Sequence, residues 1–196
     1  MAAAAALAAP AGAQYVSDSE PFIQAVTNRD GNKATELLEL RPTLVNSRNT
    51  KGQTALIVAI SRSDVLWTGF LLGRGADPNY AASNGDTPLI AAARVGFLEA
   101  VEWLLAKGAK VEGANKMGET ALIVAVQQRQ LPVVKLLLAS GANPDRPDSA
   151  AGYSARDYAK RDTRAREILA AIEAAKAVTP AKAEELKLDD FKLEGN

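Results

Sequence analysis

The chain contains no cysteine and no histidine among its 196 residues. These absences exclude thiolate nucleophiles, disulfides, zinc sites built from Cys and His, and acid–base catalysis by histidine. The formal net charge is zero, with 23 basic and 23 acidic residues, so charge gives no argument for a nucleic-acid or membrane-surface partner. No Gly-rich phosphate loop of the P-loop type is present either. We therefore expect no cofactor, no metal ion and no enzymatic activity.

Long apolar runs are also missing from the chain. The longest apolar stretch lies in residues 1–14, which are too few to span a bilayer. An apolar run, Pro10 and the small residues Ala11 to Ala13 are typical of the second half of a secretory signal peptide, although no Lys or Arg precedes them. Two interpretations stay open. Either the segment is a signal remnant and the chain is periplasmic or secreted, beginning near Gln14, or it is a disordered tail of a cytoplasmic protein.

A repeat of 33 residues is the main pattern in the sequence. Gly52, Gly85 and Gly118 are spaced by 33 residues, and a threonine follows each of them two positions later. A Gly-Ala pair that begins at Gly75 recurs twice at the same interval. Such a period is the signature of a repeat protein, in which each unit buries its apolar face against its neighbours.

Each full unit is predicted to contain two helices. The threonine after the turn glycine is expected to accept a hydrogen bond from an open backbone N–H, as a helix N-cap does. Apolar residues spaced as one helical face follow it. In the first full unit, a break at Ser63–Asp64 precedes a second helix over residues 65–72, which ends before a left-handed Gly75. The corresponding second helices are expected over residues 98–105 and 131–138.

The period divides the chain into units. The full repeats are residues 49–81, 82–114 and 115–147, flanked by an N-terminal cap repeat at 15–48 and a C-terminal cap repeat at 148–176. Atypical end units are expected, because one side of each must face water. In the N-terminal cap we expect a short helix at Phe22–Val26 and a second helix at 34–40. In the C-terminal cap the second helix is expected over 163–176.

Residues 177–196 are predicted to form a charged flexible tail. The carboxylate pairs Glu184–Glu185 and Asp189–Asp190 lie there, without the rigid placement that acid–base catalysis needs. Four apolar residues between the charges leave a second interpretation open, in which the tail is a short docking segment for this chain or for a partner.

The stretch Thr87-Pro88-Leu89-Ile90-Ala91-Ala92, the 33-residue period and the Gly108–Ala109 pair resemble the ankyrin repeat family. The resemblance covers about residues 15–176. It implies an all-α-dominated solenoid of about five units, each made of a β-turn finger and two antiparallel helices. It also implies that the fingers and the concave helix surface bind another protein.

Two features depart from the family pattern. The family usually has a histidine after Thr-Pro-Leu, and this chain has isoleucine at positions 57, 90 and 123, so apolar packing is expected where the family has a polar network. The glycine between the two helices is present only as Gly96. Ser63 and Arg129 replace it in the other full units, so we expect shifted or strained turns there.

The candidate partner-binding residues are those of the fingers, and, by the resemblance, those at the ends of the first helices. They are Arg48, Lys51, Gln53, Arg62, Asn84, Asp86, Arg94, Lys116, Met117, Glu119, Gln128 and Tyr153. Any one of them is equally consistent with ordinary solvated surface. Taken together, their mixed charges favour a protein partner over a polyanion.

Leu66 and Trp67 form a second candidate patch. Leu66 stands where the later units have Glu99 and Pro132, so this helix has gained apolar bulk on its outer side. The two interpretations are local repacking of the core and a second docking patch on the outer face.

Arg156, Lys160 and Arg164 recur at four-residue spacing in the last unit. Acidic residues interleave with them, which favours a salt-bridged helix face over a basic stripe for nucleic acid.

The sequence therefore predicts a non-catalytic protein–protein interaction module, monomeric by itself, with no nucleic-acid partner and no membrane span. A competing hypothesis is a structural or stabilising subunit of an envelope complex, docked through Leu66 and Trp67 or through the C-terminal tail.

Overall fold

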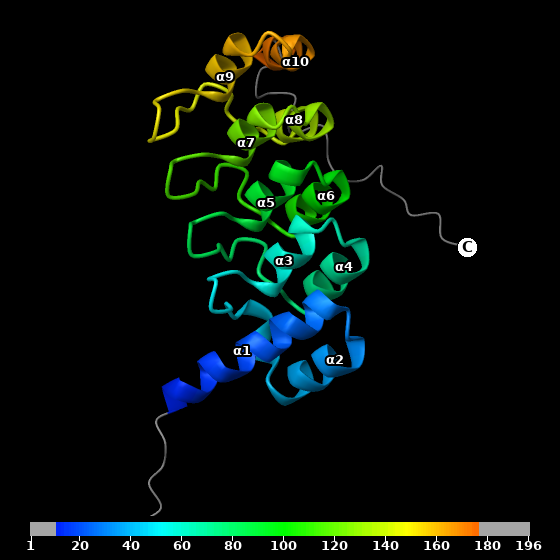
Figure 1. The fold of residues 1–196 in the computed structure, drawn as a ribbon. Coiled ribbons are helices and arrows are strands. Elements are labelled where there is room, and N and C mark those ends of the chain that lie inside the picture. The colour runs from blue at the N-terminus through cyan, green and yellow to red at the C-terminus, as the bar shows by residue number, and fades with distance from the viewer. Residues whose placement is uncertain (1–10, 177–196) are drawn as a thin grey trace, which may run out of the picture.

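The computed structural model describes residues 11–176, which form five stacked helix pairs (Figure 1). The helices are α1 (Ala11–Asn28), α2 (Gly31–Leu40), α3 (Ala55–Ser61), α4 (Val65–Gly73), α5 (Pro88–Val95), α6 (Leu98–Ala106), α7 (Ala121–Gln127), α8 (Leu131–Ala139), α9 (Ala155–Arg161) and α10 (Arg166–Lys176). A short 3-10 helix, η1 (Pro42–Asn46), follows α2. The odd-numbered helices form the row next to the loops, and the even-numbered helices form the opposite row.

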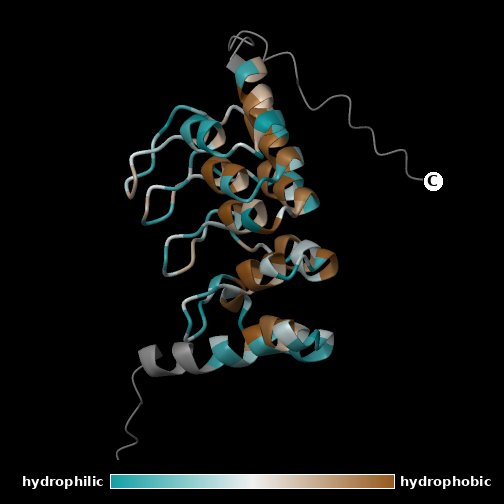
Figure 2. Ribbon diagram, turned by 45° about the horizontal axis from the view of Figure 1, so that its top comes forward, coloured by the Kyte–Doolittle hydropathy of each residue, from teal (hydrophilic) through white to brown (hydrophobic). Residues whose placement is uncertain are grey.

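The all-α-dominated solenoid predicted from the sequence is confirmed. Within residues 11–176 the extended backbone is limited to isolated β-bridges inside the finger loops, such as Arg48 with Thr54 and Ala114 with Thr120. Figure 2 shows the loops mostly hydrophilic and the hydrophobic stretches on the helices. Helices of both rows contribute to the core, as with the buried Leu56 of α3 and Leu71 of α4.

The predicted helix N-caps are confirmed in all three full units. The hydroxyl oxygens of Thr54, Thr87 and Thr120 accept from the backbone N–H three residues later, at 3.1, 3.2 and 3.3 Å. In each case the donor is the isoleucine that stands in the family's histidine position. These three isoleucines are at most 4% exposed, so they pack in the core as expected.

The turns between the two helices keep one geometry whether or not they contain glycine. Ser63 and Arg129 adopt positive φ angles of 52° and 56°, close to the 73° of Gly96. The turns are therefore strained and not shifted, because a residue with a Cβ pays roughly 1–2 kcal/mol in the left-handed region. The Arg129 side chain partly offsets this cost by pairing with Asp162 of the next unit, at 2.6 Å.

The first predicted helix is much longer than expected. Phe22–Val26 is the last part of α1, which begins at Ala11 and contains Pro21. A proline often occupies the first turn of a helix, so Pro21 suggests a helix start from the sequence alone.

The second helix of the C-terminal cap begins later than predicted, at Arg166 instead of position 163. The side chain of Asp162 accepts from the Arg164 N–H at 3.0 Å and holds a turn before the helix begins.

Residues 1–10, which make up most of the signal-like segment, and residues 177–196 of the charged tail lie outside the described part of the chain. Between residues 11 and 176, the helices are too short or too polar to cross a membrane.

Candidate functional site

The finger loops stack on one another through backbone hydrogen bonds, which positions them side by side along one face (Figure 1). The N–H of one residue in each finger donates to a carbonyl of the preceding finger. The bonds run from Ser83 to Gly52 (2.8 Å), from Lys116 to Asn84 (3.3 Å) and from Ser149 to Met117 (2.8 Å). The fingers therefore form one continuous surface and not four independent loops.

The first full finger has no finger before it, and a carboxylate from α1 accepts its hydrogen bonds instead. The backbone N–H and the hydroxyl of Thr50 donate to Oε2 of Glu20, at 2.9 and 3.0 Å. These hydrogen bonds lower the pKa of Glu20 below its usual range, the backbone bond most strongly, and Lys51 lowers it further. The N-terminal unit thus closes the exposed edge of the first finger.

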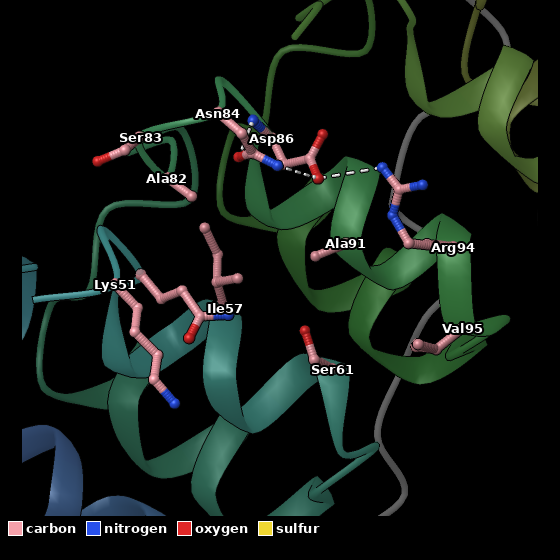
Figure 3. Close-up of a pocket in the computed structure, with 11 residues that line it drawn as sticks. Lys51, Ile57, Ser61, Ala82, Ser83, Asn84, Asp86, Ala91, Arg94 and Val95 are labelled. Carbon is pink, nitrogen blue, oxygen red and sulfur yellow. Dashed lines mark hydrogen bonds and ion pairs between the residues drawn. The ribbon is translucent and has the colours of Figure 1, made fainter. Parts of the chain in front are cut away.

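A hollow on this surface lies between the first two full fingers and helices α3 and α5 (Figure 3). Its volume is about 460 Å³. Figure 3 shows the side chains of the first finger and α3 on one side and those of the second finger and α5 on the other. Five of the candidate partner-binding residues meet here: Lys51, Gln53, Asn84, Asp86 and Arg94.

Two positions that line the hollow carry alanine in this repeat. Ala82 stands where the other fingers have Asn49, Asn115 and Asp148, and Ala91 stands where α3 and α7 have valine. In those fingers the Asn or Asp side chain accepts backbone N–H bonds and fills the loop. Both alanines line the hollow, so larger side chains at these positions would reduce its space.

Asp86 is the carboxylate at the edge of the hollow, and both of its oxygens are engaged. Oδ1 accepts from the side chain of Asn115 at 2.9 Å. Oδ2 accepts from Asn84 at 2.9 Å and from the Arg94 guanidinium at 3.0 Å (Figure 3). Arg94 neutralises this buried acid, whereas Lys51, on the opposite side, is exposed.

Further polar contacts continue along the same face into the third finger. The Asn115 side chain donates to Glu119 at 2.8 Å as well as to Asp86, and Gln127 of α7 donates to Glu119 at 3.3 Å. Of the candidate residues, Glu119 is therefore buried and hydrogen-bonded, while Lys116 and Met117 are exposed.

Asp148 holds the last finger in shape. Burial acts to raise the pKa of Asp148, but hydrogen bonds from the Tyr158 hydroxyl, at 2.6 Å, and from three backbone N–H groups outweigh it and lower the pKa below its usual range. The same hydrogen bond, with burial, raises the pKa of Tyr158. The candidate residue Tyr153 lies beside this pair, with its ring edge-on to Tyr158 and beneath the Arg161 guanidinium.

Three candidate residues lie away from the hollow. The Arg48 side chain contacts the next unit: its guanidinium donates to the Ala81 carbonyl and lies over the Tyr80 ring. Arg62 donates to the Thr27 carbonyl at 2.8 Å and is exposed. Gln128 is exposed at the end of α7.

The structure separates the two residues of the second candidate patch. The side chain of Leu66 is 82% exposed, whereas Trp67 is only 8% exposed and packs edge-on against Phe70. An outer patch made of both residues therefore does not form. Trp67 belongs to the core, and Leu66 is exposed next to Val65 at the start of α4.

Two of the three basic residues at four-residue spacing in the last unit are paired with carboxylates. Arg156 binds Asp145 at 2.6 Å, and Arg164 approaches Asp162 at 3.5 Å. The hydrogen bond to Asp145 raises the pKa of Arg156. Between residues 11 and 176, no group of three metal-ligating side chains is placed to hold an ion.

Sequence reasoning found the charged rim of the hollow but missed Ala82 and Ala91 at its base. Alanine carries no functional group, so neither position stands out when a unit is read alone. The available signal was the comparison of equivalent positions between units, in which both alanines replace larger side chains.

Residues 67–148 match the family model for ankyrin repeats, in three copies. The matched segment therefore consists of ankyrin repeats. The matched segment contains most of α4, the second and third fingers and α5 to α8, and it ends inside the fourth finger; the helices on either side extend the same stack. Ankyrin repeats generally act as protein–protein interaction modules, and the family is typically non-catalytic. No curated protein matches the sequence significantly.

Proposed function

We propose that this protein is a non-catalytic binding module that holds a partner protein against its fingers and first helices, with the hollow between the first two full fingers as the centre of contact. The observation that carries the proposal is the hollow itself. Its base is apolar and its rim carries hydrogen-bonding and charged groups, which is the composition of a recognition site.

The rigidity of this face also supports the proposal. The fingers are fixed to one another by backbone hydrogen bonds, and Asp86 fixes Asn84, Asn115 and Arg94 in a single network. A surface that is already ordered loses little conformational entropy when a partner binds.

Site-specific photo-crosslinking tests the proposal. A photoreactive amino acid is placed at Ser61, which is exposed and lines the hollow, at Leu66 on the outer side of α4, or at Lys135 on α8. Each variant is irradiated in an extract of the source cells, and adducts are identified by mass spectrometry. The expected result is a specific adduct from Ser61, removed by excess unmodified protein, and none from Lys135.

The same three positions address the competing hypothesis of a structural subunit docked on the outer side. The exposure of Leu66 favours that hypothesis. An adduct from Leu66 together with no adduct from Ser61 would contradict the proposed binding face and would support docking on α4.

A further inference from the structure

The hollow between the first two full fingers has features that select one kind of partner segment. Resting on the binding function proposed above, we propose that it takes a segment of the partner in which an aliphatic side chain fills the space over Ala82 and Ala91 and a neighbouring Asp or Glu meets Lys51.

The shape of the hollow accounts for the aliphatic side chain. Ala82 and Ala91 line the space, and the buried Ile57 adds a third apolar wall. In the neighbouring units, valine occupies the position of Ala91 and asparagine or aspartate that of Ala82. A branched aliphatic group from a partner would therefore restore the packing that the neighbouring units obtain from their own side chains.

The charges around the hollow account for the acidic residue. Its charged lining residues are Lys51, Arg94 and Asp86. Arg94 and Asp86 neutralise each other through their 3.0 Å ion pair, which leaves the positive charge of Lys51.

Glu20 is the acidic group that interacts with Lys51, but its hydrogen bonds go to Thr50. Lys51 is therefore available at the rim for a carboxylate from the partner. Charge complementarity of this kind sets partner choice and orientation.

Peptide titration followed by 15N NMR tests this inference without knowledge of the natural partner. The probe is a synthetic octapeptide of alternating Leu and Glu. Two matched octapeptides, alternating Leu with Lys and Ser with Glu, serve as controls. The Leu/Glu peptide is expected to shift the amide signals of the second finger and of α5, and to bind at least about tenfold more tightly than either control.

Variants drawn from the neighbouring repeats test the geometry. Ala91→Val and Ala82→Asn each install the residue found at the equivalent position of another unit, so both should fold, and each should weaken binding of the Leu/Glu peptide by about tenfold. Ala139→Val, on the exposed end of α8, is the matched control and should leave binding unchanged. Thermal unfolding of each variant shows that the fold is retained.

The charge is tested by Lys51→Glu, with Lys135→Glu on α8 as the matched control. Lys51→Glu should reduce affinity for the Leu/Glu peptide. The difference in affinity between this variant and the unmodified protein should become smaller as salt is added. Lys135→Glu should have no effect.

The inference is overturned if the Leu/Lys peptide binds as tightly as the Leu/Glu peptide, if the shifted amides lie outside the second finger and α5, or if the folded Ala91→Val and Ala82→Asn variants bind unchanged. These outcomes are distinct from failure of the proposed function. If the Ser61 crosslink persists in the Ala91→Val variant, the proposed binding face stands and the proposed acidic–aliphatic segment is rejected.

Discussion

Thr68 in α4 is fully buried, and within residues 11–176 its hydroxyl is the one buried side-chain group without a hydrogen-bond partner. The equivalent positions in α6 and α8 are Val101 and Val134, both fully buried. The structure around these positions is therefore built for a branched apolar side chain, and the hydroxyl of Thr68 is an unpaired polar group in that environment.

We predict that Thr68→Val raises the free energy of unfolding by about 1–2 kcal/mol, because it removes the desolvation cost of an unsatisfied hydroxyl. The measurement is urea unfolding followed by circular dichroism. The same substitution at Thr54 is the matched control with the opposite sign. Thr54→Val removes an N-cap hydrogen bond and should cost about 1 kcal/mol. Stabilisation of both variants, or of neither, would contradict the unpaired hydroxyl at Thr68 and the N-cap hydrogen bond at Thr54.

Asp148 predicts an acid dependence of stability. Its pKa in the folded protein lies below the usual value of about 3.8, so the ionised form stabilises the fold at any higher pH. This contribution is lost as the pH falls below about 3.8 and through the folded-state pKa. Asp148→Asn keeps an acceptor for the loop, as Asn115 does in the preceding finger, but has no proton to take up.

The Asp148→Asn variant should therefore lose less stability than the unmodified protein between about pH 4 and pH 2, as measured by urea unfolding at each pH. Part of the acid dependence should remain, since the pKa values of Glu20, Asp157 and Asp162 are lowered as well. The exposed change Glu99→Gln serves as the control. An unaltered slope in Asp148→Asn would show that Asp148 does not contribute to the acid dependence of stability.

At the scale of the elements, the finger turns differ in what lies beside their glycines. Gly118 has a φ of 77°, and a Cβ there would come within 2.4 Å of the Ser149 backbone nitrogen in the next finger. Gly152 has nearly the same φ, 72°, but a Cβ there would enter open space. The two positions therefore separate the cost of backbone strain from the cost of finger packing.

We predict that Gly152→Ala destabilises the protein by about 1–2 kcal/mol through backbone strain alone. Gly118→Ala should destabilise it clearly more, because a larger cost, the steric clash with the next finger, adds to the same strain. Thermal or urea unfolding of the two variants gives the comparison. Equal losses would show that the fingers move apart easily and that their close approach does not stabilise the stack.

The elements that could be predicted from the sequence are those with local causes. The N-caps could be predicted from a threonine before an apolar run, and the turns from a glycine or the residue that replaces it. N-caps and turns both depend on residues only a few positions apart. The extent of α1 was missed because Pro21 looks like a helix start. The burial of Trp67 agrees with one of the two interpretations left open, core repacking, and the sequence could not decide between them because the contact with Phe70 depends on tertiary packing.

For the whole molecule, stability depends on each unit covering the next. Helix α7 contacts α9, and α8 contacts α10, so the C-terminal unit covers the end of the stack. Ile168 and Ile172 of α10 are buried in this contact region and by themselves contribute about 3–6 kcal/mol.

A chain that ends at residue 147 should therefore unfold at lower urea concentration and bind a dye for exposed apolar surface more strongly than a chain that ends at residue 176. The physical reason is the uncovered side of α7 and α8. Coincident unfolding curves for the two chains would contradict a capping role for the last unit.

At the same scale, the sequence placed five charged or polar rim residues on one face but could not show that they enclose a hollow. The space depends on what Ala82 and Ala91 lack and on how closely two units stack. Stacking distance is a property of the assembled units, so a single unit read alone does not contain it.

The two alanines lie in one unit, residues 82–114, and the hollow forms wherever that unit follows another. Tandem duplication of this unit would therefore create a second hollow one repeat further along the stack. The two would not be equivalent, because the position of Lys51 would be filled by Asn84 in the copy. If the hollow binds a partner as proposed, a single duplication would add a second, unlike binding site, and linked ligands would gain avidity without a new fold.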